Sequence, residues 1–134
     1  MQDRPTALEL LGAVERFLDE QVVPNSEGTR RFHARVAANV LRIVARELEQ
    51  EEAHLAAEWS GLDGLLGPAD RPATLAALRE GLRLRNEELC GRIRSGEADS
   101  GPYRERVLSY VRRTVRDKLV VSDPGWVQRS EAGD

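Results

Sequence analysis

The chain has 134 residues, a net charge of −3 and a single cysteine, Cys90. A chain of this length is one ordinary domain, which can bury enough apolar surface to fold without a metal or a disulfide. The acidic balance is atypical of a nucleic-acid binder, and one cysteine excludes both an internal disulfide and a cysteine-rich metal site. We expect no metal and no cofactor, and the charge disfavours a nucleic-acid partner, the weakest alternative being contact through the arginines at 106, 112, 113 and 116.

Leucine, valine and alanine dominate the apolar residues, and there are only two Phe, two Tyr and two Trp. Arginine, glutamate and leucine favour helices, and no segment alternates as a strand would. The N-terminus carries Asp3, Glu9 and Glu15 without a long apolar run, so we expect neither a signal peptide nor a membrane span. The sequence thus predicts an all-α protein of the cytoplasm.

The first predicted helix follows Thr6, which can act as its N-cap with Glu9 completing a capping box. Pro24 and Asn25 end this helix. Its apolar face consists of Leu8, Leu11, Val14, Phe17, Leu18 and Val22.

The second predicted helix opens at Gly28 and Thr29 and has the clearest pattern in the chain. At 100° per residue its apolar side chains fall in one arc of roughly 120°, which is typical of an amphipathic helix facing a core. These side chains are Phe32, Val36, Val40, Ile43 and Val44. The opposite side carries Arg31, Arg35, Arg42 and Arg46.

A change of charge predicts a break in this helix near residues 50–52. Residues 29–46 contain five arginines and no acid, whereas residues 47–58 contain five glutamates and no Lys or Arg. Glutamates oppose the dipole at a helix C-terminus and favour it at an N-terminus, and an unbroken helix to Trp59 would be roughly 45 Å long. We therefore expect a separate short helix ending at Gly67, with Leu55, Trp59, Leu62 and Leu66 on its inner face.

Two further helices complete the predicted fold. One begins at Pro72 and ends at Ser95, with a core stripe of Leu75, Leu78, Leu82, Leu89 and Ile93 that Asn86 interrupts. The other begins at Ser100 and ends at the turn 122–125, with Val107, Leu108, Val111, Val115 and Leu119 facing inward. We expect Trp126 to hold the tail on an up-and-down bundle of four main helices plus one short helix over residues 1–128, with residues 129–134 disordered.

His33 is the main candidate for a functional side chain. It projects from the apolar arc beside Arg30 and Arg35, with Asn39 at the edge of that arc. A helix N-terminus with arginines can bind an anion, and positive surroundings favour the neutral imidazole that acts as a general base. The alternative is a core histidine that donates a hydrogen bond to a carbonyl or carboxylate. No His or Cys follows at i+3 or i+4 to begin a metal site.

The other polar features have structural interpretations as well. Asn39 and Asn86 border or interrupt apolar stripes, and we expect them to bond each other across two helices, the alternative being a polar pocket. Acids on the first helix can form ion pairs with the basic half of the second helix. Arginines at 79, 83, 92 and 94 can form ion pairs with the glutamates at 47–58. Alternatively, the arginines of the second helix and those at 106, 112, 113 and 116 grip phosphates or an acidic partner.

No catalytic motif is present in the sequence. Cys90 lies near Glu87 and Glu88, which disfavour a reactive thiolate, and we expect it to be a small buried side chain. The glycines at 61, 64 and 67 match neither nucleotide-binding spacing.

A family resemblance is carried by four segments: DRPTALELLGAVERFLDEQVVP, RFHARVAANVLRIVARELE, LCGRIRSGE and KLVVSDP. These segments are similar to an uncharacterised bacterial family of small helical proteins of unknown function, most strongly over residues 31–49. Members are often encoded beside aminoglycoside-phosphotransferase-like kinases and acyl-CoA dehydrogenases. The resemblance implies a role alongside those enzymes in acyl or hydroxyacid catabolism, and it carries over no catalytic residues.

The missing catalytic motif and the segregated charges favour a non-enzymatic accessory or interaction protein. The resemblance implies a phosphotransferase-like kinase or an acyl-CoA dehydrogenase as its partner. The alternative is a small-molecule binding protein or cryptic enzyme that holds an anionic metabolite near Arg30, His33, Arg35 and Asn39. The long second helix and the scarcity of aromatic residues are compatible with a homodimer.

Overall fold

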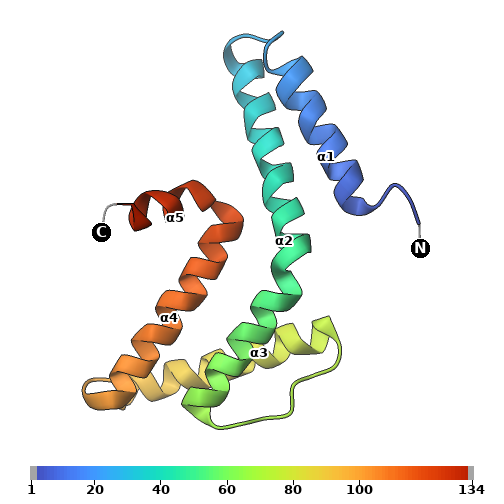
Figure 1. The fold of residues 1–134 in the computed structure, drawn as a ribbon. Helices are drawn as coiled ribbons and strands as arrows, with labels where there is room; N and C mark the ends of the chain where they lie inside the picture. Colours follow the sequence, from blue (N-terminus) through green and yellow to red (C-terminus); the bar gives the residue numbers. More distant parts are fainter. Residues whose placement is uncertain (1–2, 133–134) are drawn as a thin grey trace. The chain divides into compact units, whose positions relative to one another are not determined.

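The computed structural model describes residues 3–132, and every regular element in that range is a helix (Figure 1). The elements in chain order are α1 (Ala7–Phe17), the π-helical turn η1 (Leu18–Val22), α2 (Gly28–Leu66), α3 (Leu75–Arg94), α4 (Gly101–Ser122) and α5 (Pro124–Glu131). The prediction of an all-α protein with four main helices and one short one is confirmed, although the short helix is α5.

The chain divides into two compact units, Met1–Gln50 and Glu51–Asp134. We call them unit 1 and unit 2 and describe each by itself. The up-and-down arrangement of the whole chain and its single domain over residues 1–128 stay predictions. Within the described residues, no helix has the length and apolar character needed to cross a membrane.

The break predicted near residues 50–52 is wrong, because α2 continues without interruption for 39 residues. Its length is about 58 Å at 1.5 Å per residue. No glycine or proline lies between Thr29 and Ser60, so nothing in the backbone interrupts the hydrogen-bond ladder. The unfavourable dipole term of exposed glutamates is only about 0.3–1 kcal/mol each, too little to end such a helix.

Unit 1 is a hairpin in which α1 lies beside the N-terminal half of α2 (Figure 1). The predicted capping box is present: the Thr6 amide donates to Glu9 Oε2 at 2.6 Å, and the Glu9 amide donates to Thr6 Oγ1 at 3.2 Å. Arg42 of α2 forms ion pairs with Glu15, at 2.5 Å, and with Asp19. The predicted match between acids on the first helix and arginines on the second is therefore confirmed at Arg42.

The apolar face predicted for the second helix is not the face that packs in unit 1. Ala34 and Ala38 are the buried residues of this half of α2, and Val23 and Ser26 are buried in the preceding turn. The large side chains expected in the core, Phe32, Val36, Val40 and Val44, are instead exposed. Small alanines let α1 approach α2 closely, and a hairpin of two helices offers each helix only one neighbour to cover it.

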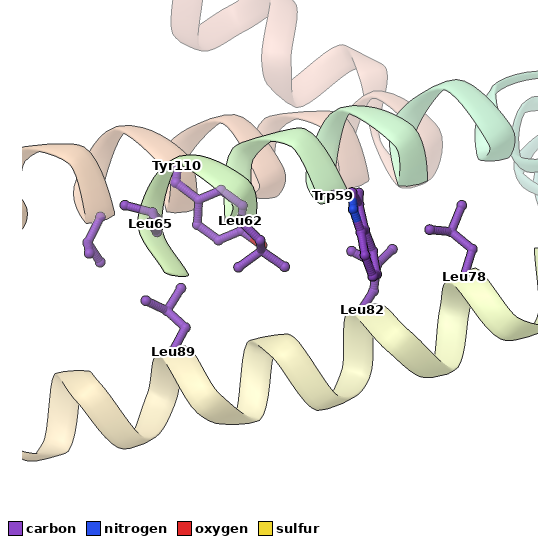
Figure 2. Close-up of a cluster of buried hydrophobic side chains, with 8 residues drawn as sticks. Trp59, Leu62, Leu65, Leu78, Leu82, Leu89 and Tyr110 are labelled. Atoms are coloured by element: carbon purple, nitrogen blue, oxygen red, sulfur yellow. The ribbon is translucent and has the colours of Figure 1, made fainter. Parts of the chain in front are cut away.

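Unit 2 contains the main hydrophobic core, in which side chains of α2 and α3 point toward one another (Figure 2). Its buried members are Trp59, Leu62 and Leu65 from α2, Leu78, Leu82 and Leu89 from α3, and Val107 and Tyr110 from α4. The predicted core positions in this list are confirmed. Leu65 and Tyr110 were not predicted.

The ends of the last three helices follow from local capping. Thr74 caps α3, so that helix begins at Leu75 rather than Pro72, whereas α4 begins at Gly101, directly after the predicted start at Ser100, whose side chain makes no capping hydrogen bond. Asp123 ends α4 and caps α5, with its Oδ1 accepting the Trp126 amide at 3.1 Å. The helix α5 extends into the stretch predicted to be disordered, of which residues 133–134 lie outside the described residues.

Candidate functional site

The four residues predicted to bind a ligand, Arg30, His33, Arg35 and Asn39, all lie on α2 in unit 1 and are all exposed. The His33 ring contacts the Phe32 ring edge-to-face, with centroids 5.5 Å apart. The interpretation of His33 as a histidine sealed in the core is therefore wrong. Anion binding by these residues stays a prediction.

Asn86 belongs to a polar cluster inside unit 2 rather than to the predicted pair with Asn39. Its Nδ2 donates to Glu58 Oε1 at 2.8 Å and to the Leu82 carbonyl at 3.0 Å. The Tyr110 hydroxyl donates to Asn86 Oδ1 at 3.0 Å, and Glu58 Oε1 lies 3.4 Å from the same hydroxyl. The expectation of an Asn39–Asn86 bond was wrong, whereas Asn86 does tie helices together, because these residues join α2, α3 and α4.

Tyr110 acts in this cluster as a fixed hydrogen-bond donor. Burial, followed by the nearby Glu58 carboxylate, raises the pKa of Tyr110 to about 12. The phenol therefore keeps its proton at neutral pH and cannot serve as a base. The cluster orients the core side of three helices, and its geometry favours a structural role over a catalytic one.

This cluster predicts a loss of stability in alkali. An ordinary tyrosine has a pKa near 10, so the folded protein holds the Tyr110 proton more tightly than the unfolded chain does. The resulting stabilisation is complete below pH 10 and is lost as the pH rises through 12. Urea unfolding between pH 9 and pH 12 should show that the free energy of unfolding falls more steeply with pH in the wild type than in Tyr110→Phe.

The matched control for that experiment is Tyr103→Phe, which removes a hydroxyl from the same helix. The Tyr103 hydroxyl is buried and has no hydrogen-bond partner, so its removal should cost nothing at neutral pH. At neutral pH Tyr103→Phe should therefore unfold like the wild type, whereas Tyr110→Phe loses its hydrogen bonds to Asn86 and Glu58. An equally steep fall in Tyr110→Phe would show that another group is responsible.

A second polar cluster fixes the segment that leaves α2. Arg85 Nη1 donates to Asp63 Oδ1 at 2.7 Å, and Arg85 Nη2 donates to the Gly67 carbonyl at 2.7 Å. The guanidinium also lies over the Trp59 ring, 4.6 Å from its centroid. Asp63 accepts the Ala69 amide at 3.2 Å as well. All of these groups have partners within unit 2, so the cluster holds the fold rather than a ligand.

Unit 2 has an open groove of about 500 Å³ between α4 and α5. We call it the α4–α5 groove. Its lining is apolar along Val111, Val115, Leu119, Trp126 and Val127, and it is flanked by Arg112 and Arg116. Val115 and Trp126 are about half exposed, at 49% and 50%. An apolar floor with basic flanks is suited to an amphipathic ligand that carries negative charge.

Sequence reasoning placed the groove residues in the wrong environment. Val111 and Val115 were expected to face the core, and Trp126 was expected to hold the tail; all three are exposed, while Val127 is buried. The turn at Asp123 was the one feature of the sequence that could have indicated the groove, because it starts a short helix that has to lie beside α4. Cys90 is also exposed rather than buried.

The described part of the chain contains no group of three or more His, Cys, Asp or Glu side chains placed to hold a metal ion. Fold and surface together define a small all-helical protein with an open apolar groove between α4 and α5. The chain belongs to the family described as DUF6285, a domain of unknown function, which matches residues 24–126. Searches among curated proteins and solved structures gave no match. Membership of a family of unknown function, predicted from the four segments, is confirmed.

Proposed function

We propose that this protein is a non-enzymatic accessory protein that binds an acidic amphipathic helix of a partner protein in the α4–α5 groove. The single observation that supports this function is the groove itself, about 500 Å³ in volume, with an apolar floor and two flanking arginines. A helix that lays its apolar face into such a groove is a common mode of protein recognition.

The charge of α4 determines which kind of helix fits. The segment Gly101–Ser122 contains six basic residues, Arg104, Arg106, Arg112, Arg113, Arg116 and Lys118, and two acids, Glu105 and Asp117. This local excess stands out in a chain whose net charge is −3. Complementary charge steers association and excludes basic competitors, so the partner helix should carry acids beside its apolar stripe.

The first partners to test are a phosphotransferase-like kinase and an acyl-CoA dehydrogenase, the two enzyme classes that the family resemblance implies. The proposal places the complex in the cytoplasm. In it the protein supplies a binding surface to an enzyme and carries out no chemistry of its own.

Trp126 provides a direct readout of groove binding. It is half exposed, whereas the other tryptophan, Trp59, is buried, so occupation of the groove should shift the emission of Trp126 to shorter wavelength. Titration with each purified candidate partner should give this shift. Val115→Asp, which puts a carboxylate in the groove, should weaken binding by roughly tenfold or more.

The control is Leu84→Asp on α3, where the leucine is 51% exposed and lies outside the groove. It should bind like the wild type. Equal loss in both variants, or the absence of any emission shift with either candidate enzyme, would contradict the proposal.

A second candidate function is binding of a small anionic amphiphile, because the groove has a volume typical of ligand pockets, roughly 300–1,000 Å³. The same titration tests it with a carboxylate or phosphoester that carries an apolar chain. The other proposed anion site, at Arg30, His33, Arg35 and Asn39, is tested by His33→Ala. That variant should abolish anion binding without lowering Tm if the site exists, since the side chain is exposed.

A further inference from the structure

An open pocket of about 190 Å³ lies between the last turns of α2 and the first half of α4. We call it the α2–α4 pocket. The end of α2 contributes Gly61, Gly64 and Leu65, and α4 contributes Arg106, Ser109, Tyr110 and Arg113. All of these residues belong to unit 2, so the pocket is defined within one compact unit.

Two glycines on α2 shape this pocket. At Gly61 the backbone lies close to the Tyr110 ring, because a Cβ there would be 2.7 Å from Tyr110 Cδ2. At Gly64 a Cβ would meet nothing within 4 Å, so the space beside this residue is open. Leu65 and Tyr110 are buried members of the core of unit 2 (Figure 2), and they give the pocket an apolar floor.

The rim of the pocket is polar and positively charged. Arg106, Ser109 and Arg113 are all exposed and follow one another at spacings of three and four residues, which places them on one face of α4. Arg106 and Arg113 are about 10 Å apart along the helix axis at 1.5 Å per residue. Two arginine side chains can close this distance around an anion that lies over Ser109.

The acids nearest to these arginines on α4 do not neutralise them. Glu105 forms its ion pair with Arg104, 3.6 Å away. Asp117 follows Arg113 by one turn, and within the described part of the chain it forms no ion pair with that arginine. The two guanidiniums therefore repel each other, and an anion between them would replace this repulsion with attraction.

Arg106 is already held at the wall of the pocket. Its Nη1 donates to the Gly64 carbonyl at 3.5 Å, and its guanidinium lies 5.5 Å from the centroid of the Tyr103 ring. A guanidinium has five N–H donors, so this hydrogen bond leaves others for a ligand. A side chain that is partly fixed before binding also loses less conformational entropy when the ligand arrives.

We propose that the α2–α4 pocket binds a small phosphate ester, whose phosphate group is held by Arg106, Arg113 and the Ser109 hydroxyl. A phosphate dianion balances two guanidiniums, and its oxygens accept the paired N–H groups of arginine. The apolar floor contacts a short organic group. The volume of about 190 Å³ excludes larger ligands, whose pockets measure roughly 300–1,000 Å³.

This site is separate from the α4–α5 groove, although both use α4. Arg112 flanks the groove and Arg113 lines the pocket. Adjacent residues of a helix point in directions about 100° apart, so the two arginines can serve different sites. The pocket can therefore bind its ligand whether or not the groove binds a partner helix.

The test is a titration of the full chain with glycerol phosphate, followed by the backbone amide signals in ¹H–¹⁵N NMR spectra at constant ionic strength. The signals of Gly64, Ser109 and Arg113 should shift and saturate. Arg113→Gln should raise the dissociation constant by about tenfold or more. Arg112→Gln removes the same charge from the neighbouring residue, outside the pocket, and should bind like the wild type.

A second pair of variants tests the shape of the pocket. Gly64→Leu should fill the open space and abolish binding. Gly91→Leu is the control on α3, where a Cβ also meets nothing within 4 Å, and it should bind like the wild type. The Tm of each variant shows that both are folded.

Four results would overturn the proposal. The first is the absence of any saturable shift, and the second is an equal loss of binding in Arg113→Gln and Arg112→Gln, since anions would then bind to the general charge of α4. The third is tighter binding of succinate, which would indicate a dicarboxylate site. The fourth is equal affinity for inorganic phosphate and glycerol phosphate, because the apolar floor would then contact no organic group.

Discussion

Replacing Arg85 with methionine should lower the free energy of unfolding by about 2–3 kcal/mol, although methionine fits the same volume. The Arg85 side chain is only 11% exposed, and it is the charged partner of Asp63, which is 32% exposed. Removing one member of a buried ion pair leaves the other without compensation, at a cost of about 3–5 kcal/mol in fully buried cases. The loss expected for Arg85→Met is smaller than this because water reaches part of Asp63.

The loss extends beyond the ion pair, because Arg85 holds three different groups. Its second nitrogen satisfies the Gly67 carbonyl at the end of α2, and its plane covers Trp59 in the core. Arg85→Lys would keep the charge but lose the fork that reaches both oxygens, so it should recover only part of the stability. Urea unfolding followed by far-ultraviolet circular dichroism gives these values.

The control is Arg83→Met, two residues away on α3. Arg83 pairs with Glu80 and Glu87 within its own helix, and its side chain is 53% exposed. Exposed pairs of this kind contribute little to stability because water screens them, so the change should be barely measurable. If Arg83→Met and Arg85→Met were equally destabilising, general loss of positive charge on α3 would explain both.

Features that depend on neighbouring residues could be predicted from the sequence. The capping box of Thr6 and Glu9 needs only a spacing of three residues and a helix after it. Charge matching between helices was also predictable where chain direction is fixed by a short turn, as at Arg42 with Glu15, and at Arg79 with Glu51. The inner residues of unit 2, such as Leu78 and Leu82, followed from periodicity because three helices surround them.

Features that depend on what covers a face could not be predicted. The apolar arc of Phe32, Val36 and Val40 has the right period for a core, but a period says nothing about whether another helix of the same chain reaches that side. Asn86 was recognised as a polar residue among apolar ones, yet its partners, Glu58 and Tyr110, lie 28 and 24 residues away in sequence. The break predicted in α2 failed because a weak dipole effect was set against an uninterrupted hydrogen-bond ladder.

The candidate sites show the same limit. The exposed arginines and His33 were found because their residue types are distinctive, whereas the α4–α5 groove is made of ordinary valines whose meaning depends on where α5 lies. The charge change near residue 50 did carry information, since the boundary between the two compact units falls there. It marks a change of neighbours along one helix rather than the end of a helix.

Gly61→Ala should destabilise the protein, whereas Gly64→Ala, one turn later in the same helix, should not. A Cβ at Gly61 would lie 2.7 Å from Tyr110 Cδ2, and the ring cannot easily retreat because its hydroxyl is bonded to Asn86. A Cβ at Gly64 would meet nothing within 4 Å. Both substitutions gain the same helix propensity, up to about 1 kcal/mol. The difference between the free energies of unfolding of the two variants therefore measures the clash alone.

That difference should be about 1–3 kcal/mol in urea unfolding, the usual cost of overpacking a well-packed core. The pair also tests why a glycine-rich stretch occurs here. The spacing of the glycines at 61, 64 and 67 fits no nucleotide-binding loop, and the structure gives two of them other reasons. Gly61 makes room for Tyr110, while Gly67 has a φ of 100° and ends α2. If Gly61→Ala were as stable as Gly64→Ala, the Tyr110 ring would have room to shift. The hydrogen bonds from Tyr110 to Asn86 and Glu58 would then not hold α2, α3 and α4 in one fixed arrangement.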